Sequence, residues 1–222
     1  MKSYLVIFVP AALLAIAAIT YVNSSNKNSL KDNHQAEFAG VAKSPKADLD
    51  SCCIMELTAA TRSDNSIYLL NAEWKDQDGN KEMLRNFEGK KVVLAMIYTS
   101  CPTACPVIIG KMQSLEAAIP HGELKNYHFL LISIDPNRDT FERMRRFASE
   151  RSLDPKTWTL LTGSKNNIAE LAELIGFKYK ENANGNFTHS NLITFLDKDG
   201  VIINQSEGLE QTTNDLLAML NK

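Results

Sequence analysis

The stretch Val92–Ile109, VVLAMIYTSCPTACPVII, predicts both the type of fold and the position of its reactive groups. Residues 92–98 are all apolar and partly β-branched, which is typical of a strand buried on both faces inside a parallel sheet. A helix is predicted next, because apolar residues recur at helical spacing until Pro120 and Gly122: Val107, Ile108, Met112, Leu115 and Ile119. Cys101 and Cys105 therefore lie between the end of a strand and the start of a helix.

The two cysteines are each followed by proline, which disfavours helical backbone at the residue before it. Pro106 suits the first position of a helix, so we predict that Cys105 is the N-cap of this helix. The partial positive charge at a helix N-terminus favours a thiolate, the form that attacks disulfides and binds metals.

The composition is that of a globular protein with room for one core, since 44% of the 222 residues are hydrophobic and 23% are charged. The net charge of −2 gives no electrostatic reason to expect nucleic acid as a partner. Four cysteines are too few for a disulfide-stapled scaffold. They form two close pairs, Cys52–Cys53 and Cys101/Cys105, which indicates chemistry rather than framework.

The first 22 residues predict a membrane anchor or a signal peptide. Lys2 precedes an apolar run from Tyr4 to Val22, close to the roughly 20 residues that span a bilayer. Ala15-Ile16-Ala17 is also a candidate cleavage site, so a secreted form is the alternative to a single-pass anchor. Residues 23–50 are polar and predict a flexible linker, and residues 51–222 predict the folded domain. In either case the domain is expected on the exported, periplasmic or extracytoplasmic, side of the membrane, where disulfides persist.

The order of the remaining elements predicts an α/β fold with a mixed sheet flanked by helices. A second buried strand is expected at Phe129–Ile134, followed by a helix that Asp139 caps together with Glu142. Further expectations are strands at 66–70, 73–74, 158–161, 191–196 and 201–205, helices after Ser164 and at 214–220, and a polar loop at 180–187.

Three groups follow or precede predicted strands at one edge of the sheet. Cys101 and Asp135 each follow a buried strand that leads into a helix, and α/β proteins place their sites at this edge. His189 precedes the strand at 191–196. A lone histidine in such a place is more often structural than a ligand, so its position alone leaves both readings open.

Three blocks of this sequence resemble the Sco/SenC family. They are Tyr98–Pro106, Ser133–Thr140, and Thr188–Ser190 together with Asp197–Gly200. The resemblance covers roughly Ser66 to the C-terminus and implies a thioredoxin-like fold. It also implies a copper site made by Cys101, Cys105 and His189, and a role in maturing the binuclear copper centre of a respiratory oxidase. The copper subunit of that oxidase would be the partner, and another copper respiratory enzyme is the alternative.

The residue chemistry is compatible with that implication. Two thiolates and an imidazole suit copper, as Cu(I) or Cu(II), and a disulfide between the same sulfurs would exclude the metal. Asp135 and Asp139 are candidates to orient these ligands, although a helix cap is the simpler role for Asp139. Cys52, Cys53 and Met55 form a possible auxiliary soft site.

Other classes of protein remain to be weighed. A thiol–disulfide oxidoreductase or a redox sensor in the exported compartment is the main alternative, although the C-x-x-x-C spacing favours chelation over the usual C-x-x-C exchange motif. A peroxiredoxin is disfavoured by Leu94 and Tyr98, which stand where that class has proline and a hydroxyl residue. Zinc hydrolysis is disfavoured because no general base is evident beside the cysteines.

Overall fold

The computed structural model describes residues 64–221. The predicted anchor or signal segment at 1–22, the linker at 23–50 and the residues Cys52, Cys53 and Met55 lie outside the described part. Among residues 64–221, no helix has both the length and the hydrophobicity needed to cross a membrane.

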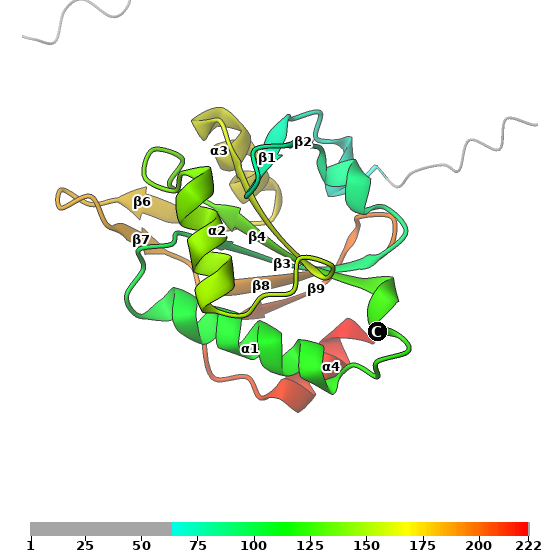
Figure 1. Ribbon diagram of the computed structural model, residues 1–222. Coiled ribbons are helices and arrows are strands. Elements are labelled where there is room, and N and C mark those ends of the chain that lie inside the picture. The colour runs from blue at the N-terminus through cyan, green and yellow to red at the C-terminus, as the bar shows by residue number, and fades with distance from the viewer. Residues whose placement is uncertain (1–63, 222) are drawn as a thin grey trace, which may run out of the picture. The chain divides into compact units, whose positions relative to one another are not determined.

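The described chain is built on a mixed seven-stranded sheet with the strand order β2-β1-β5-β4-β3-β8-β9 (Figure 1). The three central strands, β3 (Lys91–Ile97), β4 (Tyr127–Ser133) and β5 (Trp158–Gly163), are parallel to one another. The antiparallel strands lie outside them: β1 (Trp74–Asp76), β2 (Lys81–Glu82), β8 (Leu192–Leu196) and β9 (Ile202–Glu207). The predicted α/β class with a mixed sheet is confirmed.

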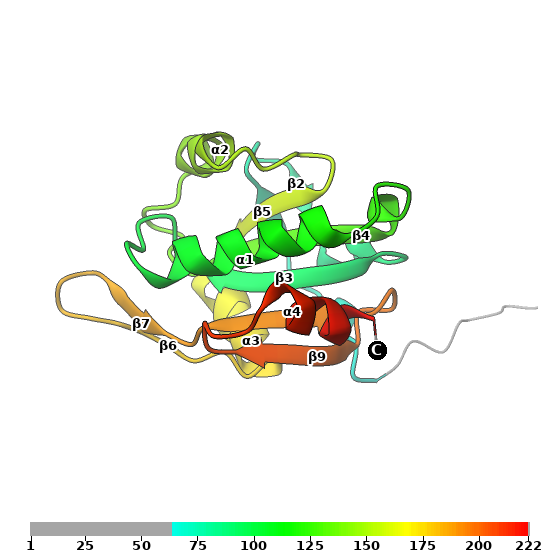
Figure 2. The same ribbon diagram turned by 90° about the horizontal axis from the view of Figure 1, so that it is seen from below.

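Helices cover both faces of this sheet. Figures 1 and 2 show α1 (Ala104–Ala118) and α2 (Phe141–Glu150) on one face and α3 (Lys165–Leu174) on the other. The last helix, α4 (Thr213–Leu220), packs against α1 and β9. This two-sided cover explains why β3 and β4 are apolar at nearly every position, since neither face of these strands meets water.

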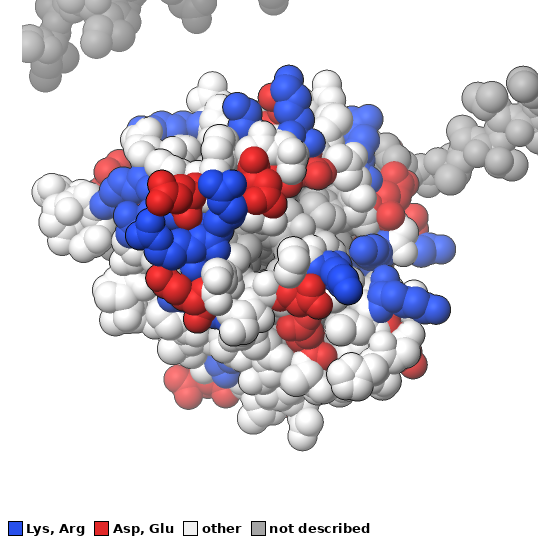
Figure 3. Space-filling model, viewed as in Figure 1, with Lys and Arg blue, Asp and Glu red and all other residues white. Residues whose placement is uncertain are grey.

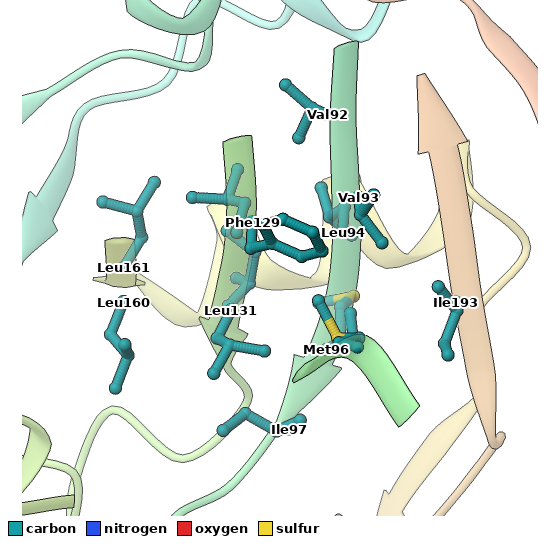
Figure 4. Packing of buried hydrophobic residues seen from close by; sticks show 14 of the residues in the cluster. Val92, Val93, Leu94, Met96, Ile97, Phe129, Leu131, Leu160, Leu161 and Ile193 are labelled. Carbon is teal, nitrogen blue, oxygen red and sulfur yellow. The ribbon is translucent and has the colours of Figure 1, made fainter. Parts of the chain in front are cut away.

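The core lies around the central strands, where side chains alternate between the two faces. Figure 4 shows Val93, Leu94, Met96, Phe129 and Leu131 among the packed side chains, and each is fully buried. The ring of Phe129 stacks on Trp158 of β5 with centroids 4.7 Å apart. At about 25 cal/mol per Å² of apolar surface, this buried layer is the main favourable term that holds the ends of β3 and β4 in place.

Three sequence expectations about local structure are wrong. Residues 66–70 do not form a strand; Ile67–Leu69 is a 3₁₀ helix (η1), because the Ser66 hydroxyl accepts a hydrogen bond from the Tyr68 N–H and turns the chain. The polar segment at 180–187 is not simply a loop, since it contains β6 (Tyr179–Glu181) and the start of β7 (Phe187–His189), which pair as a hairpin. Val107 is 43% exposed and does not belong to the buried stripe of α1.

The β6–β7 hairpin and the first described residues lie at opposite ends of the sheet. The β6–β7 hairpin lies beside the start of α1 at one end (Figures 1 and 2). The first described residues lie at the other end, where Ser66 forms a bridge with Val201 close to the β8–β9 turn. Since Leu196 of β8 pairs with Val92 at the beginning of β3, this turn lies at the end of the sheet opposite to Cys101. The remaining 3₁₀ turns are Leu84–Phe87 (η2) and Leu124–Asn126 (η3).

Candidate metal centre

The two cysteines lie where β3 passes into α1, as predicted, but the helix begins earlier than the prolines suggested. Thr103 is the N-cap, so Cys105 is the second residue of α1 and not its cap. Proline is tolerated in a first helical turn because its missing N–H has no intrahelical partner there. The Thr103 side chain makes no capping hydrogen bond. Instead, the Cys105 N–H donates to the sulfur of Cys101, 3.4 Å away.

The two thiols are in different electrostatic environments. Burial alone would raise the pKa of Cys101, but hydrogen bonds from the Cys105 N–H and the Thr103 N–H, together with the contact to the His189 ring, outweigh it and lower the pKa to about 6. Burial raises the pKa of Cys105 far above its usual range, and the neighbouring Cys101 adds to this shift. The expectation that the helix N-terminus favours a thiolate therefore describes Cys101, whose sulfur receives the N–H of the first turn.

His189 ends β7 and places its ring over both sulfurs. Its Nε2 atom lies 3.8 Å from Cys101 Sγ and 3.8 Å from Cys105 Sγ. Its Nδ1 atom lies 2.8 Å from the carbonyl oxygen of Ser190, which only accepts hydrogen bonds. This contact places the ring proton on Nδ1 in the neutral imidazole, so the lone pair of Nε2 faces the two sulfurs.

Aromatic rings fix the orientation of His189. Tyr98, directly after β3, meets the imidazole edge-on with centroids 5.8 Å apart, and Phe177 stacks on it at 6.0 Å. The Tyr98 hydroxyl donates to the Phe187 carbonyl at 3.5 Å. Neither Tyr98 nor Phe177 was predicted to be part of the site. The position of Tyr98 at the end of the buried strand could have indicated that it belongs to the site. Nothing in the sequence beyond its hydrophobicity indicated the same for Phe177.

Asp139 does not contact either thiol or the imidazole, and it does not cap α2. Thr140 is the N-cap, with its hydroxyl accepting from the Arg143 N–H. The buried carboxylate of Asp139 instead accepts from the Thr99 N–H at 3.1 Å, from the Thr99 hydroxyl, and from the Ser133 hydroxyl at 2.6 Å. Because Thr99 is two residues before Cys101, Asp139 fixes the loop that carries the first thiol to the ends of both buried strands.

Asp135 is linked to the hairpin that carries His189, whereas Asp139 is linked to the cysteine loop. Asp135 is 4% exposed, and its carboxylate pairs with the Nε of Arg138. The Arg138 guanidinium lies 5.8 Å from the centroid of the Phe187 ring, at the start of β7. Asp135 therefore reaches the hairpin of His189 through Arg138 and contacts no ligand atom directly.

The donor atoms fit a single metal ion. The sulfurs of Cys101 and Cys105 and a ring nitrogen of His189 lie within 4.8 Å of one another, the one such group of three found among the described residues. Metal bonds of about 2.3 Å to sulfur and about 2.1 Å to nitrogen could reach all three atoms from a point between them. The second nitrogen of His189 already has the carbonyl partner typical of a metal-bound histidine.

The fold and site together define an α/β protein with a cysteine pair and a histidine at one edge of its sheet. The chain belongs to the SCO1/SenC family, whose family model matches residues 69–222. This finding confirms the resemblance carried by the three sequence blocks around Cys101, Asp135 and His189.

Individual relatives support the same assignment. The chain is 27% identical over 146 residues to the SCO1 protein homolog of Bacillus subtilis, covering 64% of this chain and 75% of that protein. The structure of Bradyrhizobium japonicum ScoI with copper bound is 26% identical with a TM-score of 0.57, covering 68% of this chain and 95% of that one. BsSco, described as having a disulfide switch and as a member of the Sco family of cytochrome c oxidase assembly proteins, is 24% identical with a TM-score of 0.59, covering 67% and 88%; this likeness shows the fold.

Proposed function

We propose that this protein binds copper through Cys101, Cys105 and His189 and serves the assembly of a respiratory oxidase. The observation that carries the proposal is the position of His189 Nε2, 3.8 Å from both sulfurs with its lone pair directed at them. Two thiolates and an imidazole form the soft N/S donor set that suits copper. The copper-bound structure of a relative supports the choice of metal.

The same two sulfurs supply a redox switch. When Cys101 and Cys105 are both thiols or thiolates they are available as ligands, and when they form a disulfide with each other they are not. Forming that disulfide releases two electrons and two protons, which a disulfide on the recipient protein takes up as it becomes two thiols. The protein would thus deliver copper to the binuclear centre of the oxidase or reduce the cysteines of that centre. The description of BsSco as an oxidase assembly protein supports this recipient.

The N-terminal sequence supports a proposal for the location of the protein in the cell. We place residues 1–22 as a single-pass membrane anchor, residues 23–50 as a linker and residues 51–222 as the domain on the exported side; a cleaved signal peptide with a secreted domain is the alternative. Cys52, Cys53 and Met55 are kept as a proposed auxiliary soft site for copper.

The alternative function is that of a thiol–disulfide oxidoreductase, in which the hydrogen bond from the Cys105 N–H to the Cys101 sulfur would stabilise the attacking thiolate. The lowered pKa of Cys101 suits a nucleophilic thiol, and Cys105 is the neighbouring thiol that would resolve the mixed disulfide. In this function Cys101 attacks a substrate disulfide, and Cys105 then attacks the mixed disulfide to release the reduced product. Metal binding would then be incidental.

Copper loading of the full chain in detergent tests the proposal. The reduced protein is titrated with Cu(II), and we expect a thiolate-to-copper absorption band together with one equivalent of bound metal. Cys101→Ser and Cys105→Ser should each abolish the band. His189→Ala should weaken copper binding by at least about tenfold, because a ligand is lost.

His121→Ala is the matched control, since His121 is exposed in the turn after α1 and should bind and absorb as the unaltered protein does. Copper binding that survives Cys101→Ser and His189→Ala, combined with loss of disulfide reductase activity in Cys101→Ser, would favour the oxidoreductase instead.

A further inference from the structure

The thiols of this protein are hidden, which restricts how a partner reaches them. Cys101 is 7% exposed and Cys105 is 1% exposed. The surrounding loop and the first turn of α1 are exposed at Pro102, Thr103, Pro106 and Val107. A protein that exchanges disulfides with either sulfur would therefore contact this rim.

The surface beside the rim is rich in arginine. A hollow of about 510 Å³ is lined by Thr99 of the cysteine loop and by residues of α2 and its flanks. Its charged lining consists of four arginines and two glutamates: Arg138, Arg143, Arg146, Arg151, Glu142 and Glu150. We call this feature the arginine groove. Figure 3 shows the blue side chains gathered over α2, with a few red ones among them.

The arginines of the groove differ in how firmly they are held. Arg143 donates to the Thr99 hydroxyl at 2.7 Å and lies 3.9 Å from the buried carboxylate of Asp139, and Arg138 pairs with Asp135. Arg143 and Arg138 therefore help to hold the residues around the metal centre in place. Thr99 therefore lies both in the groove and two residues before Cys101.

The other two arginines are available to a partner. Arg146 pairs with Glu142 at 2.9 Å, but both side chains are about two-thirds or more exposed. Such a pair is worth only about 0.3–0.5 kcal/mol and is easily exchanged. Arg151 stacks on the Phe147 ring at 3.6 Å and has no acidic partner within residues 64–221. A stacked guanidinium keeps its planar edge free for a carboxylate.

We propose that the arginine groove docks an acidic segment of the protein with which the dithiol exchanges. This inference rests on the proposed function and adds the chemical character of the partner. Arginine recognises carboxylates through paired, planar hydrogen bonds, and Arg146 and Arg151 are the two arginines with which a partner's carboxylates can pair. The groove adjoins the rim of the cysteine loop, so a segment bound there holds its own protein over Cys101.

The test uses synthetic peptides that each carry one cysteine as a 2-pyridyl disulfide. The peptides are identical except that the cysteine is flanked by several glutamates, glutamines or lysines. The Cys101 thiolate attacks the peptide sulfur and releases 2-thiopyridone, whose absorbance gives the rate. Cys105 then attacks Cys101, which closes the protein disulfide and releases the peptide thiol. With the full chain in detergent at about 20 mM salt, the glutamate peptide should react about tenfold faster than the glutamine peptide.

Two variants locate this preference on the protein. Arg146→Glu combined with Arg151→Glu should remove the preference for the glutamate peptide and leave the rate with the glutamine peptide unchanged. Arg145→Glu is the matched control, because Arg145 is on the same helix and 53% exposed but pairs with Asp78, outside the groove. It should retain most of the preference. Salt at about 0.5 M should equalise the three peptides.

Several outcomes would overturn the inference. One is equal rates for the glutamate and glutamine peptides, and another is a preference that Arg145→Glu removes as completely as the groove variant. A third is that inorganic phosphate or phosphatidylglycerol vesicles bind in an Arg146- and Arg151-dependent manner while the acidic peptide does not, which would make the groove a phosphate site. Copper loading is measured on the same proteins: a normal thiolate–copper band with no peptide preference rejects the docking surface alone, whereas absence of the band rejects the copper function.

Discussion

The carboxylate of Asp139 holds Thr99 by two hydrogen bonds, one from its N–H and one from its hydroxyl, and thereby fixes the approach to Cys101. The same carboxylate accepts from the Ser133 hydroxyl at the end of β4. One buried side chain thus ties together the ends of the two central strands and the loop of the first thiol. Donors left without an acceptor in such a buried place are costly.

Asp139→Ala should lower the free energy of unfolding by about 3 kcal/mol, because three donors lose their acceptor. It should also loosen residues 99–101 and make Cys101 more accessible to alkylation. Urea unfolding of the reduced protein measures the first effect. Asp78→Ala removes an exposed carboxylate paired with Arg145 at 3.7 Å and should cost under about 0.5 kcal/mol. A similar small loss for both variants would contradict the anchoring role of Asp139.

The two thiols should differ in their reactivity with pH. Since the pKa of Cys101 is about 6, its alkylation rate should rise through pH 6 and level off near neutrality. Cys105, whose pKa is raised by burial, should still be gaining reactivity at about pH 9. Iodoacetamide labelling followed by peptide mass spectrometry reads both sites in one sample. Denatured protein is the control, because both thiols should then titrate near their ordinary pKa of about 8.5.

His128 should make the stability depend on pH far from the site. It is 5% exposed on β4, and its Nε2 lies 2.9 Å from the Thr159 hydroxyl. Burial, with the charge of Lys90, lowers its pKa from 6.5 to about 4. Between these values the unfolded chain binds a proton that the folded chain excludes. The stability contribution is therefore complete above about pH 6.5 and is lost as the pH falls toward 4, amounting to about 3 kcal/mol.

Urea unfolding from pH 7 to pH 4.5 measures this loss of stability. Subtracting the loss measured for His128→Gln removes the contribution of carboxylates, which the two proteins share. The unaltered protein should lose more stability than the variant over this range. His121→Gln, which changes an exposed histidine, should retain the full pH dependence. If the free energy of unfolding changes with pH by the same slope in all three proteins, His128 is not the source of the pH dependence.

Several features of the fold could be predicted because they depend on short-range patterns. The apolar run at 92–98 needs two covering layers whatever its neighbours are, and the prediction of a central strand is confirmed. Helix boundaries were less predictable. Asp139 and Thr140 are both good N-caps, and the choice depends on whether a neighbouring strand offers Asp139 better donors. Only the folded structure shows that Thr99 and Ser133 do so.

The site shows the same division between local and long-range information. The prediction that two cysteines lie at a strand–helix junction required only residues 92–109. The contact of His189 with the cysteine pair, 88 residues from Cys101, was predicted only from the family resemblance, because no local pattern links the histidine to the cysteines. Phe177 and Arg138 were not predicted as parts of the site, since each contributes through a contact with the hairpin that forms only in the tertiary fold.

The last prediction concerns Arg138, which connects Asp135 to the Phe187 ring and so to the strand of His189. Arg138→Ala should free the β6–β7 hairpin and speed hydrogen exchange at residues 179–190 about fivefold, which corresponds to the loss of about 1 kcal/mol from an ion pair and a cation–π contact. Arg138→Lys keeps the charge but loses the planar guanidinium. The rate of hydrogen exchange in its hairpin should therefore lie between the rates in the unaltered protein and in Arg138→Ala. Mass spectrometry of the reduced, metal-free protein gives this result without relying on copper. Unchanged exchange in Arg138→Ala would mean that the hairpin is held by its own strand pairing and by Tyr98, whose hydroxyl contacts the Phe187 carbonyl.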